Sequence, residues 1–411
     1  MNEKKIFLNT FYQIIGKIFV SLFGLISISF LTRYFDKTTN FSEYSLAFSF
    51  VGLTFIFADF GLGTLLTRNI ASGKERSSYF SQIFTLRVIL STVVILFSFL
   101  LVMFLPYTNE VKIGILIVSF SNLFLTLSST IWSVFQVELK FSKIVIVQIV
   151  SSLISFILII LGVFMKLDLF YFLSVSVVSS FAGLIISIKL NKYKEKLIIL
   201  DFDRFKKIIK ESLPFALGLI ASVGYLKIDS VILSFYYNPS YTMDVGIYAI
   251  AYKIFEVVLV FGGFFSQTLF PFFSGIKDKK IFLKSYKKYF IYTLILSIGS
   301  AVFIFLFSDP LIQILGGDNF GQAIYPLKIL SLAGGITVLS GFFLNIALCG
   351  YKEVLVFKFS LIAFFTNVVL NIIFIPKFSY IGASWITVAT QLFILFSNMI
   401  AAYLVVREYN N

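Results

Sequence analysis

The sequence predicts an all-α integral membrane protein with about twelve transmembrane helices, and three observations carry that prediction. Of the 411 residues, 59% are hydrophobic and 13% are charged, whereas soluble domains have roughly 45–50% apolar and 25% charged residues. Apolar segments recur along the whole chain, and each is long enough to cross a hydrocarbon core of about 30 Å. The third observation is that the Lys and Arg residues concentrate in alternate loops.

The predicted spans form two sets of six. The first set lies near residues 11–31, 44–66, 79–105, 111–135, 144–165 and 167–188. The second set lies near residues 212–237, 245–272, 289–308, 324–349, 354–375 and 380–405. The start of the chain has a charged end but no small-residue cleavage site, so we interpret it as leading into a retained first helix. We therefore expect an N-terminal six-helix lobe over 1–190 and a C-terminal six-helix lobe over 212–411.

A basic cytoplasmic linker, residues 191–211, separates the two predicted lobes. Its bases alternate with Ile, Leu and Phe. This pattern suits a short amphipathic helix lying against anionic headgroups. A solvated linker that only fixes the topology is equally compatible with it.

The distribution of basic residues predicts the orientation. With the N-terminus inside, 24 of the 34 Lys and Arg residues fall on one side and four within spans. Six fall on the opposite side: Arg33, Lys37, Lys112, Lys166, Lys328 and Lys377. By the positive-inside rule, we expect both termini to lie in the cytoplasm. The net charge of +14 thus reflects topology, and we expect no nucleic-acid partner.

Composition and loop length exclude several chemistries. The chain has no histidine and one cysteine, Cys349, which leaves no intramolecular disulfide and predicts no metal site. Neither DFGLG (59–63) nor LGGDNFG (315–321) matches a phosphate-binding GxxxxGK[ST] loop, so these glycines are expected to allow kinks and close helix contacts. The external loops are too short for a catalytic domain, and we expect no enzyme. Any ion coupling, by a proton or Na⁺, must use carboxylates, and no other cofactor is expected.

An internal repeat supports the two lobes. FSEYSLAF at 41–48 has the same aromatic and small-residue pattern as VGIYAIAY at 245–252, and ASGKE at 71–75 follows its span much as SGIKDK follows at 274–279. In transporters, such parallel repeats enclose a central site that alternates between the two faces of the membrane. Alternating access is therefore the predicted mode of action.

Four blocks in order resemble the polysaccharide branch of the multidrug/oligosaccharidyl-lipid/polysaccharide exporter superfamily, the Wzx-type O-antigen flippases. The first three are ADFGLGTLLTRNIASGKE (58–75), KIDSVILSFY (227–236) and VGIYAIAYKIFE (245–256). The fourth and strongest combines NIALCGYKE (345–353), TNVVLNIIFIP (366–376) and IGASWITV (381–388). The resemblance extends over nearly the whole chain.

The resemblance implies two six-helix lobes around a central cavity and a lipid-linked oligosaccharide, usually on undecaprenyl diphosphate, as the substrate. It also implies movement from the cytoplasmic to the outer leaflet. Membrane lipids, a glycan polymerase and other envelope-assembly proteins are the expected partners. Drug/toxin exporters of the same superfamily share the twelve-span layout, so a cation antiporter is the alternative.

Ionisable residues within spans are the first candidate site residues, because a charge at the bilayer centre costs roughly 2.5–3.5 kcal/mol on insertion scales. Lys17 and Arg87 lie near cytoplasmic helix ends, where they can either reach the headgroups or contact substrate. Lys227 lies too deep for that, so we predict that it contacts a diphosphate or sugar. The four bases within spans outnumber the three acids, which favours an anionic substrate.

The acids are predicted to serve ion coupling or charge pairing. Asp229 and Lys253 lie at equal depth on an expected hairpin of two continuous helices, so we expect Asp229 to neutralise Lys253. Glu256 is then left as a coupling carboxylate. Asp59 is predicted either to cap the DFGLG turn or to pair with Arg68.

Three asparagines are the uncharged candidates for substrate binding. Asn367 and Asn371 are four residues apart and share one helix face, and Asn345 lies in the preceding span. Interhelical hydrogen bonding is the alternative role of such residues in membranes.

Overall fold

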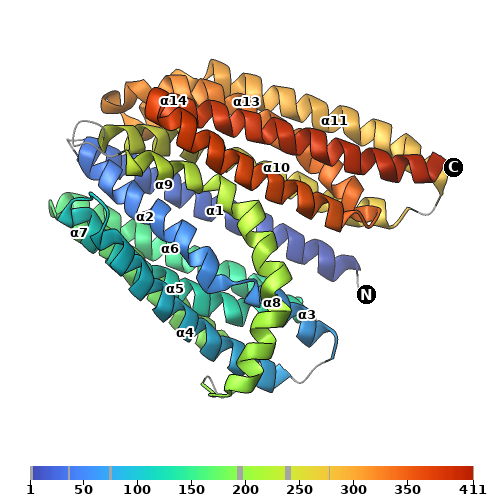
Figure 1. Ribbon diagram of the computed structural model, residues 1–411, viewed down its shortest axis with the longest axis horizontal. Helices are drawn as coiled ribbons and strands as arrows, with labels where there is room; N and C mark the ends of the chain where they lie inside the picture. Colours follow the sequence, from blue (N-terminus) through green and yellow to red (C-terminus); the bar gives the residue numbers. More distant parts are fainter. Residues whose placement is uncertain are drawn as a thin grey trace. The chain divides into compact units, whose positions relative to one another are not determined.

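The computed structural model of the chain describes residues 3–35, 38–73, 76–191, 198–236, 242–276 and 278–410. Every element in these ranges is an α-helix or a 3-10 helix, which confirms the predicted all-α fold. Eleven helical segments there are long and apolar enough to cross a membrane, so this is a multi-pass membrane protein. The chain divides into two compact units, Met1–Lys227 (unit 1) and Ile228–Asn411 (unit 2), whose helices are drawn in Figure 1.

Unit 1 contains the predicted first six spans. Its helices are α1 (Glu3–Tyr34), α2 (Thr38–Asp59), α3 (Leu62–Ala71), α4 (Arg76–Met103), α5 (Asn109–Val137), α6 (Phe141–Phe164), α7 (Leu169–Leu190), α8 (Phe202–Val223) and the 3-10 turn η1 (Gly224–Leu226). Helix α5 packs against α2, α4 and α7, and α1 packs along α6. The unit is therefore a bundle in which α5 has the most central position.

The second predicted span is broken at Phe60 and Gly61, between α2 and α3. Both residues have positive φ angles, 45° and 68°, which L side chains adopt only at a cost. A Cβ atom on Gly61 would lie 2.4 Å from the Cβ of Phe215 in α8. Glycine therefore allows both the turn and the close approach of α8, as expected for the DFGLG segment.

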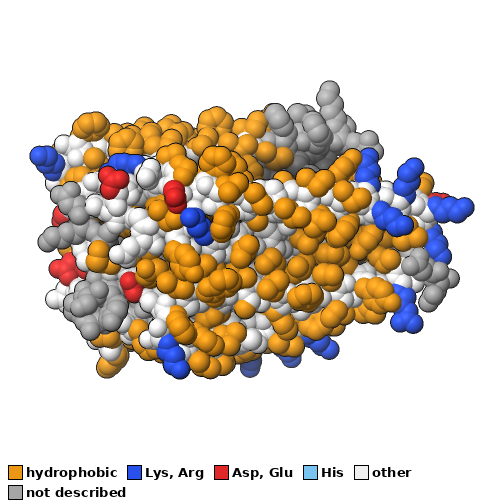
Figure 2. All heavy atoms as spheres, turned by 90° about the horizontal axis from the view of Figure 1, so that it is seen from above, with side chains coloured by type: hydrophobic (Ala, Val, Ile, Leu, Met, Phe, Trp, Pro, Cys, Tyr) orange, Lys and Arg blue, Asp and Glu red, His pale blue; other side chains and the backbone are white. Residues whose placement is uncertain are grey.

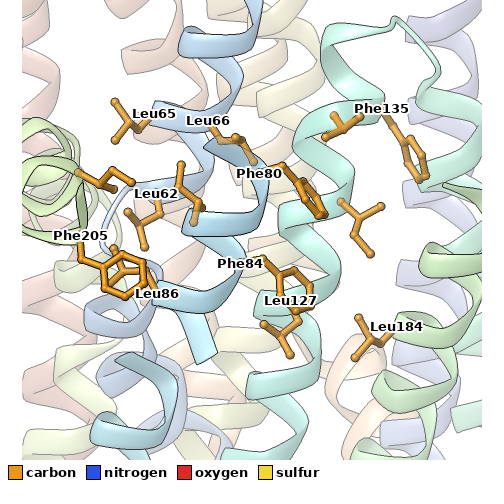
Figure 3. Packing of buried hydrophobic residues seen from close by; sticks show 14 of the residues in the cluster. Leu62, Leu65, Leu66, Phe80, Phe84, Leu86, Leu127, Phe135, Leu184 and Phe205 are labelled. Atoms are coloured by element: carbon orange, nitrogen blue, oxygen red, sulfur yellow. The ribbon is translucent and has the colours of Figure 1, made fainter. Parts of the chain in front are cut away.

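Figure 3 shows the hydrophobic cluster that holds this region together. Leu62, Leu65 and Leu66 of α3 are fully buried against Phe80 of α4. Phe205, from the first turn of α8, belongs to the same cluster. Apolar burial thus fixes α8 onto unit 1.

The position of α8 differs from both interpretations of the linker. Helix α8 begins at Phe202, inside the predicted linker, and its apolar side, with Phe205 and Ile208, packs on protein rather than on headgroups or in water. Linker residues 192–197 lie outside the described residues. The division between the compact units falls after Lys227, whereas the sequence pattern places it before residue 212.

Unit 2 contains the predicted spans eight to twelve and the last part of the seventh, whose first part is α8 of unit 1. Its elements are α9 (Ile228–Phe235), α10 (Thr242–Ser274), α11 (Lys279–Leu306), α12 (Ser308–Gly316), η2 (Asp318–Ala323), α13 (Ile324–Cys349) and α14 (Glu353–Asn410). Helix α13 packs against α10, α11 and α14. Residues 309–323, predicted as a loop, are instead helical in α12 and η2.

Helix α14 is a hairpin that supplies two crossings. Its 58 residues would extend for about 87 Å if straight, far more than a hydrocarbon core of about 30 Å. Ser379 interrupts it with φ 48° and ψ −136°. Asn367 donates a hydrogen bond to Thr390 Oγ1 over 2.9 Å, although 23 residues separate them. The two arms are therefore antiparallel, as predicted for spans 354–375 and 380–405.

An ion network joins two helix ends of unit 1 at the α5–α6 turn. Glu138 accepts hydrogen bonds from Arg76 (2.6 Å) and Lys140 (2.7 Å). Burial raises the pKa of Glu138, but the hydrogen bonds and charges of Lys140 and Arg76 outweigh it and lower that pKa to about 2. The network ties the start of α4 to the turn.

The surface is that of a protein solvated by lipid. In Figure 2, hydrophobic side chains cover most of the visible face, and Lys and Arg side chains gather towards its edges. Large apolar residues of α4, such as Leu96, Phe97 and Leu100, are 58–61% exposed. Such contiguous exposure fits helices that contact acyl chains.

Candidate functional site

A buried carboxylate forms the centre of a polar cluster in unit 2. Asp229 lies in the first turn of α9 and is 1% exposed. Its Oδ2 accepts a hydrogen bond from the hydroxyl of Tyr248 in α10 and lies 3.3 Å from Thr387 Oγ1 in α14. Its Oδ1 accepts from the backbone N–H of Ser230 over 2.8 Å. These three partners are uncharged.

The hydroxyl of Thr387 has a second acceptor close by. It lies 2.9 Å from the carbonyl oxygen of Ala383, and a hydroxyl has only one proton to donate. When that proton goes to Ala383, the hydroxyl of Tyr248 still donates to Asp229.

The α14 hairpin extends this cluster with amide groups. Asn371 Nδ2 donates to both the backbone oxygen and Oδ1 of Asn367, over 3.0 and 2.9 Å. Asn371 Oδ1 and Gln391 Nε2 are buried, and neither has a hydrogen-bond partner among the described residues.

The geometry of the hairpin places these amides near the carboxylate cluster. From the Asn367–Thr390 pair, Asn371 lies about 6 Å and Thr387 about 4.5 Å further towards the bend, at 1.5 Å per residue. Asn371 and Thr387 are therefore at nearly the same level of unit 2. Oxygen atoms from α9, α10 and the second arm of α14 meet there, in Asp229, Tyr248 and Thr387.

The predicted ion pair between Asp229 and Lys253 is wrong. Lys253 pairs with Glu256 of its own helix, over 2.9 Å, as side chains three residues apart on a helix can. The prediction assumed two continuous helices, but η1 and Lys227 interrupt the first of them. The α9 segment turns Asp229 towards Tyr248 instead.

Lys227 itself lies at the end of η1, where unit 1 ends. Its backbone has φ −122° and ψ −20°, and its N–H donates to the carbonyl of Gly224 over 3.1 Å. The side chain is half-buried. Because the helix is broken here, Lys227 and Asp229 do not keep the relative orientation that two residues have on a regular helix. Its contact with substrate stays a prediction.

Unit 1 has a buried ion pair of its own, between Arg87 of α4 and Asp59 at the end of α2. Arg87 is 1% exposed, so it does not reach towards the headgroups. Its Nη1 donates to Ser129 Oγ (2.7 Å), Thr130 Oγ1 (2.8 Å) and the carbonyl of Thr126 (3.0 Å), all on α5. The guanidinium thus joins α2, α4 and α5.

The surroundings of this pair explain two other residues. A Cβ atom on Gly63 would lie 2.9 Å from Arg87 Nη2, so the second glycine of DFGLG makes room for the guanidinium. Arg68, the alternative partner predicted for Asp59, instead lies 5.1 Å above the ring of Phe215. Asp59 pairs with Arg87 because α4 runs beside the α2–α3 break.

The remaining predicted site residues are Lys17 and Asn345. Lys17 is exposed on α1. Asn345 is 7% exposed and donates to the carbonyl of Gly341 in its own helix, over 2.7 Å. Among the described residues, no group of three or more His, Cys, Asp or Glu side chains is placed to hold a metal ion.

Sequence reasoning missed Tyr248, Thr387, Thr390 and Gln391. A signal was present for the first two, because Tyr248 lies in the block VGIYAIAYKIFE and Thr387 in the block IGASWITV. The family pattern of these blocks does not indicate which hydroxyls donate hydrogen bonds or to which acceptors. For Thr390 and Gln391 only the helical spacing from Thr387 pointed to the same face.

Comparison with solved structures shows the fold. The chain is similar to lipid II flippase MurJ in an inward closed conformation, with a TM-score of 0.79 and 18% identity, over 95% of this chain and 87% of that one. It is also similar to the MATE transporter VcmN of Vibrio cholerae in its bent form (TM-score 0.60, 14% identity, 99% and 97% of the chains). The MATE multidrug transporter DinF-BH matches with a TM-score of 0.66 and 16% identity, over 100% and 96% of the chains.

Comparison of sequences identifies the family. The capsular polysaccharide biosynthesis protein CapF of Staphylococcus aureus is 26% identical over 403 residues, which cover 94% of this chain and 96% of CapF. Residues 6–277 match the family described as polysaccharide biosynthesis protein. This match agrees with the resemblance that the four sequence blocks indicate. Since it covers well over half of its length, the chain belongs to the polysaccharide biosynthesis protein family.

Proposed function

We propose that this protein is a flippase that moves a lipid-linked oligosaccharide from the cytoplasmic to the outer leaflet of the bacterial inner membrane. Family membership supports a role in polysaccharide biosynthesis, and the fold shared with lipid II flippase MurJ supports transport of a lipid-linked glycan. Undecaprenyl diphosphate is the proposed carrier, and the movement is by alternating access. Such a role requires binding and release, without bond chemistry.

Coupling to a proton or Na⁺ at Asp229 is the second part of the proposal, and the buried polar cluster is the observation that carries it. Asp229 is 1% exposed and accepts hydrogen bonds from the N–H of Ser230 and the hydroxyl of Tyr248. Hard cations prefer oxygen ligands, and Asp229, Thr387 and Asn371 supply a carboxylate, a hydroxyl and an amide oxygen. The unsatisfied Asn371 Oδ1 fits a ligand of this kind. Binding of a cation would neutralise the carboxylate and relieve its burial cost.

A cation antiporter of the drug/toxin type is the alternative, since the MATE transporters share the fold. The count of charges within spans still has one more base than acids. Arg87 is neutralised by Asp59 and Lys253 by Glu256, which leaves Lys17 and Lys227 against Asp229. The family match and the higher structural similarity to MurJ, 0.79 against 0.60–0.66, favour the flippase.

Deletion of the gene tests the proposed substrate. A flippase mutant should keep its lipid-linked repeat units on the cytoplasmic leaflet and lose surface glycan, and the cloned gene should restore both. The leaflet is read from protection of the glycan against an external glycosidase in right-side-out vesicles. Normal surface glycan together with new sensitivity to cationic dyes would contradict the flippase and support the antiporter.

The proposed topology places both termini in the cytoplasm. A reporter fused after Lys196 or Lys284 should be cytoplasmic, and one near Asn238 or Asp318 should be external. Reversal of either pair would overturn the orientation. A glycan polymerase and other envelope-assembly proteins are the proposed partners at the outer face, where the flipped substrate is used.

A further inference from the structure

Unit 1 contains a pocket of about 950 Å³ at the end of the bundle where α1 ends. It lies among the last turn of α1, the first turn of α2 and the turn from α6 to α7. Its walls include Phe30, Arg33, Tyr34, Asn40, Lys166 and Asp168. We call it the α1–α6 pocket. None of these residues belongs to the Asp229 or Arg87 clusters.

Two contacts fix the shape of the pocket. The hydroxyl of Tyr34 donates to the carbonyl of Leu167 over 2.6 Å, which ties α1 to the α6–α7 turn. That turn is tight because Gly162 lets α7 approach closely, and a Cβ atom there would lie 2.3 Å from the ring of Tyr171. Lys166 closes α6 with a φ of 55°. These contacts hold the α6–α7 turn against the end of α1.

The charges in the pocket favour an anion. Arg33 and Lys166 supply two cations, and Asp168 supplies one carboxylate. That carboxylate also caps α7, since its Oδ1 accepts the N–H of Tyr171 over 3.0 Å. Only six bases are predicted on this side of the membrane, and two of them line this one pocket. The positive-inside rule gives no reason for bases to collect here.

The pocket also has an apolar side at membrane depth. Phe30 is 40% exposed and lies one turn before Arg33, about 4.5 Å deeper along the helix axis. Phe164, next in sequence to the pocket residue Val163, is 78% exposed. Cations at the end of the bundle and aromatic side chains one turn below match the head and the first part of the tail of a lipid.

We infer that the α1–α6 pocket binds the phosphate headgroup of an anionic lipid, with Arg33 and Lys166 as the phosphate contacts and Phe30 against the chain. In the predicted topology this lipid lies in the outer leaflet. Its source is either the bulk phospholipid of that leaflet or a polyprenyl phosphate carrier. The inference rests on unit 1 alone and does not depend on the proposed transport function.

Lipid binding to the purified full-length protein tests this inference. Apparent dissociation constants are measured in detergent by native mass spectrometry with phosphatidylglycerol, phosphatidylcholine and undecaprenyl phosphate. We expect phosphatidylglycerol to bind more tightly than zwitterionic phosphatidylcholine. The double variant Arg33→Gln/Lys166→Gln should weaken that binding by about tenfold or more, since each base near a lipid surface contributes about 1 kcal/mol. Lys112→Gln, which removes a base on the same side that does not line the pocket, should bind like the wild type.

Two further variants separate charge from folding. Arg33→Lys/Lys166→Arg keeps both charges and should retain most of the binding, whereas equal loss in both double variants would contradict a charge-based site. Asp168→Asn removes the negative charge but keeps the oxygen that caps α7, so it should bind phosphatidylglycerol more tightly. Weaker binding by this variant would also contradict the inference.

The lipids then distinguish the two sources. Similar affinity for phosphatidylglycerol and undecaprenyl phosphate supports a site for bulk anionic lipid. A clear preference for undecaprenyl phosphate, lost in Arg33→Gln/Lys166→Gln, supports a site for the carrier. Equal binding of phosphatidylcholine and phosphatidylglycerol, or unchanged binding by the double variant, would overturn the proposal.

Discussion

The hydroxyl of Tyr248 donates a hydrogen bond to the carboxylate of Asp229, and both side chains are buried, at 0% and 1% exposure. If Asp229 takes the coupling ion, Tyr248→Phe should weaken the apparent affinity for that ion by about 10–100-fold, as is typical when a partner of a ligand is lost. Asp229→Asn should abolish the ion dependence of transport. The measurement is flipping of a fluorescent lipid-linked oligosaccharide in proteoliposomes at varied Na⁺ and pH.

Protein amounts provide the control for this prediction. Because Lys253 pairs with Glu256, the loss of the Asp229 charge does not strand Lys253, and Asp229→Asn should accumulate normally. Tyr325→Phe, on an exposed tyrosine of α13, should behave like the wild type. Unchanged ion dependence in Asp229→Asn would exclude this residue as the coupling site.

Lys227 is predicted to contact the diphosphate or a sugar. Lys227→Ala should then abolish flipping at equal protein amount, and Lys227→Arg should keep part of the activity because the positive charge remains. Lys377→Ala, on an exposed lysine of α14, is the matched control. Normal transport by Lys227→Ala at equal expression would show that the cationic site lies elsewhere.

The Asp59–Arg87 pair is predicted to stabilise unit 1. Removing one partner of a buried pair costs about 3–5 kcal/mol, and the cost should be larger for Asp59→Asn than for Arg87→Met. The reason is that Arg87 is 1% exposed and its charge would stay buried, whereas Asp59 is 34% exposed. The free energy of unfolding of the two single variants and of the double variant, measured in mixed micelles, gives the coupling energy between Asp59 and Arg87. Strictly additive effects of the two substitutions would contradict a stabilising pair.

Gly61 is predicted to be irreplaceable at the α2–α3 break. Gly61→Ala places a side chain at a φ of 68° and 2.4 Å from Phe215, so we expect a loss of about 2 kcal/mol or more. Gly52→Ala in the preceding helix meets nothing within 4 Å and should be neutral or slightly stabilising. Thermal unfolding of both variants in detergent checks the difference.

The lowered pKa of Glu138 predicts that the protein loses stability in acid. Its pKa is about 2 in the folded protein, against an ordinary value of 4.5. The stabilisation is therefore complete above about pH 4.5 and is lost as the pH falls towards 2; it amounts to roughly 3 kcal/mol at most. Glu138→Gln should lower the unfolding temperature at pH 7 and remove most of the difference between pH 7 and pH 3. If the unfolding temperature of Glu138→Gln still differs between pH 7 and pH 3 as much as that of the wild type, other groups cause the acid sensitivity.

The fold was predictable because membrane spans are specified by composition and length. The predicted span 324–349 coincides with α13 (Ile324–Cys349), and the division between the last two spans falls beside Ser379. The apolar pattern does not show the break at Gly224–Lys227, because charges such as Lys227 and Asp229 also occur within continuous spans. Helical structure in 309–323 was missed because polar and glycine residues there are typical of loops.

The site residues were predictable as a set but not as pairs. Depth in the membrane identified Asp229, Lys253 and Glu256, since a buried charge in a span needs a partner. Depth does not fix the rotation of a helix, and the nearest partner of Lys253 was on its own helix. The roles of Tyr248 and Thr387 could not be predicted in this way, because a neutral hydroxyl within a span does not require a charged partner.

The Asp59–Arg87 pair has a consequence for membrane insertion. A charge within a span raises the cost of inserting its helix, and α2 and α4 are synthesised one after the other with only α3 and a short turn between them. The two helices should therefore leave the translocon together as a hairpin in which the charges of Asp59 and Arg87 neutralise each other. The order of synthesis itself would then shield both charges from lipid before helices α5 to α8 exist.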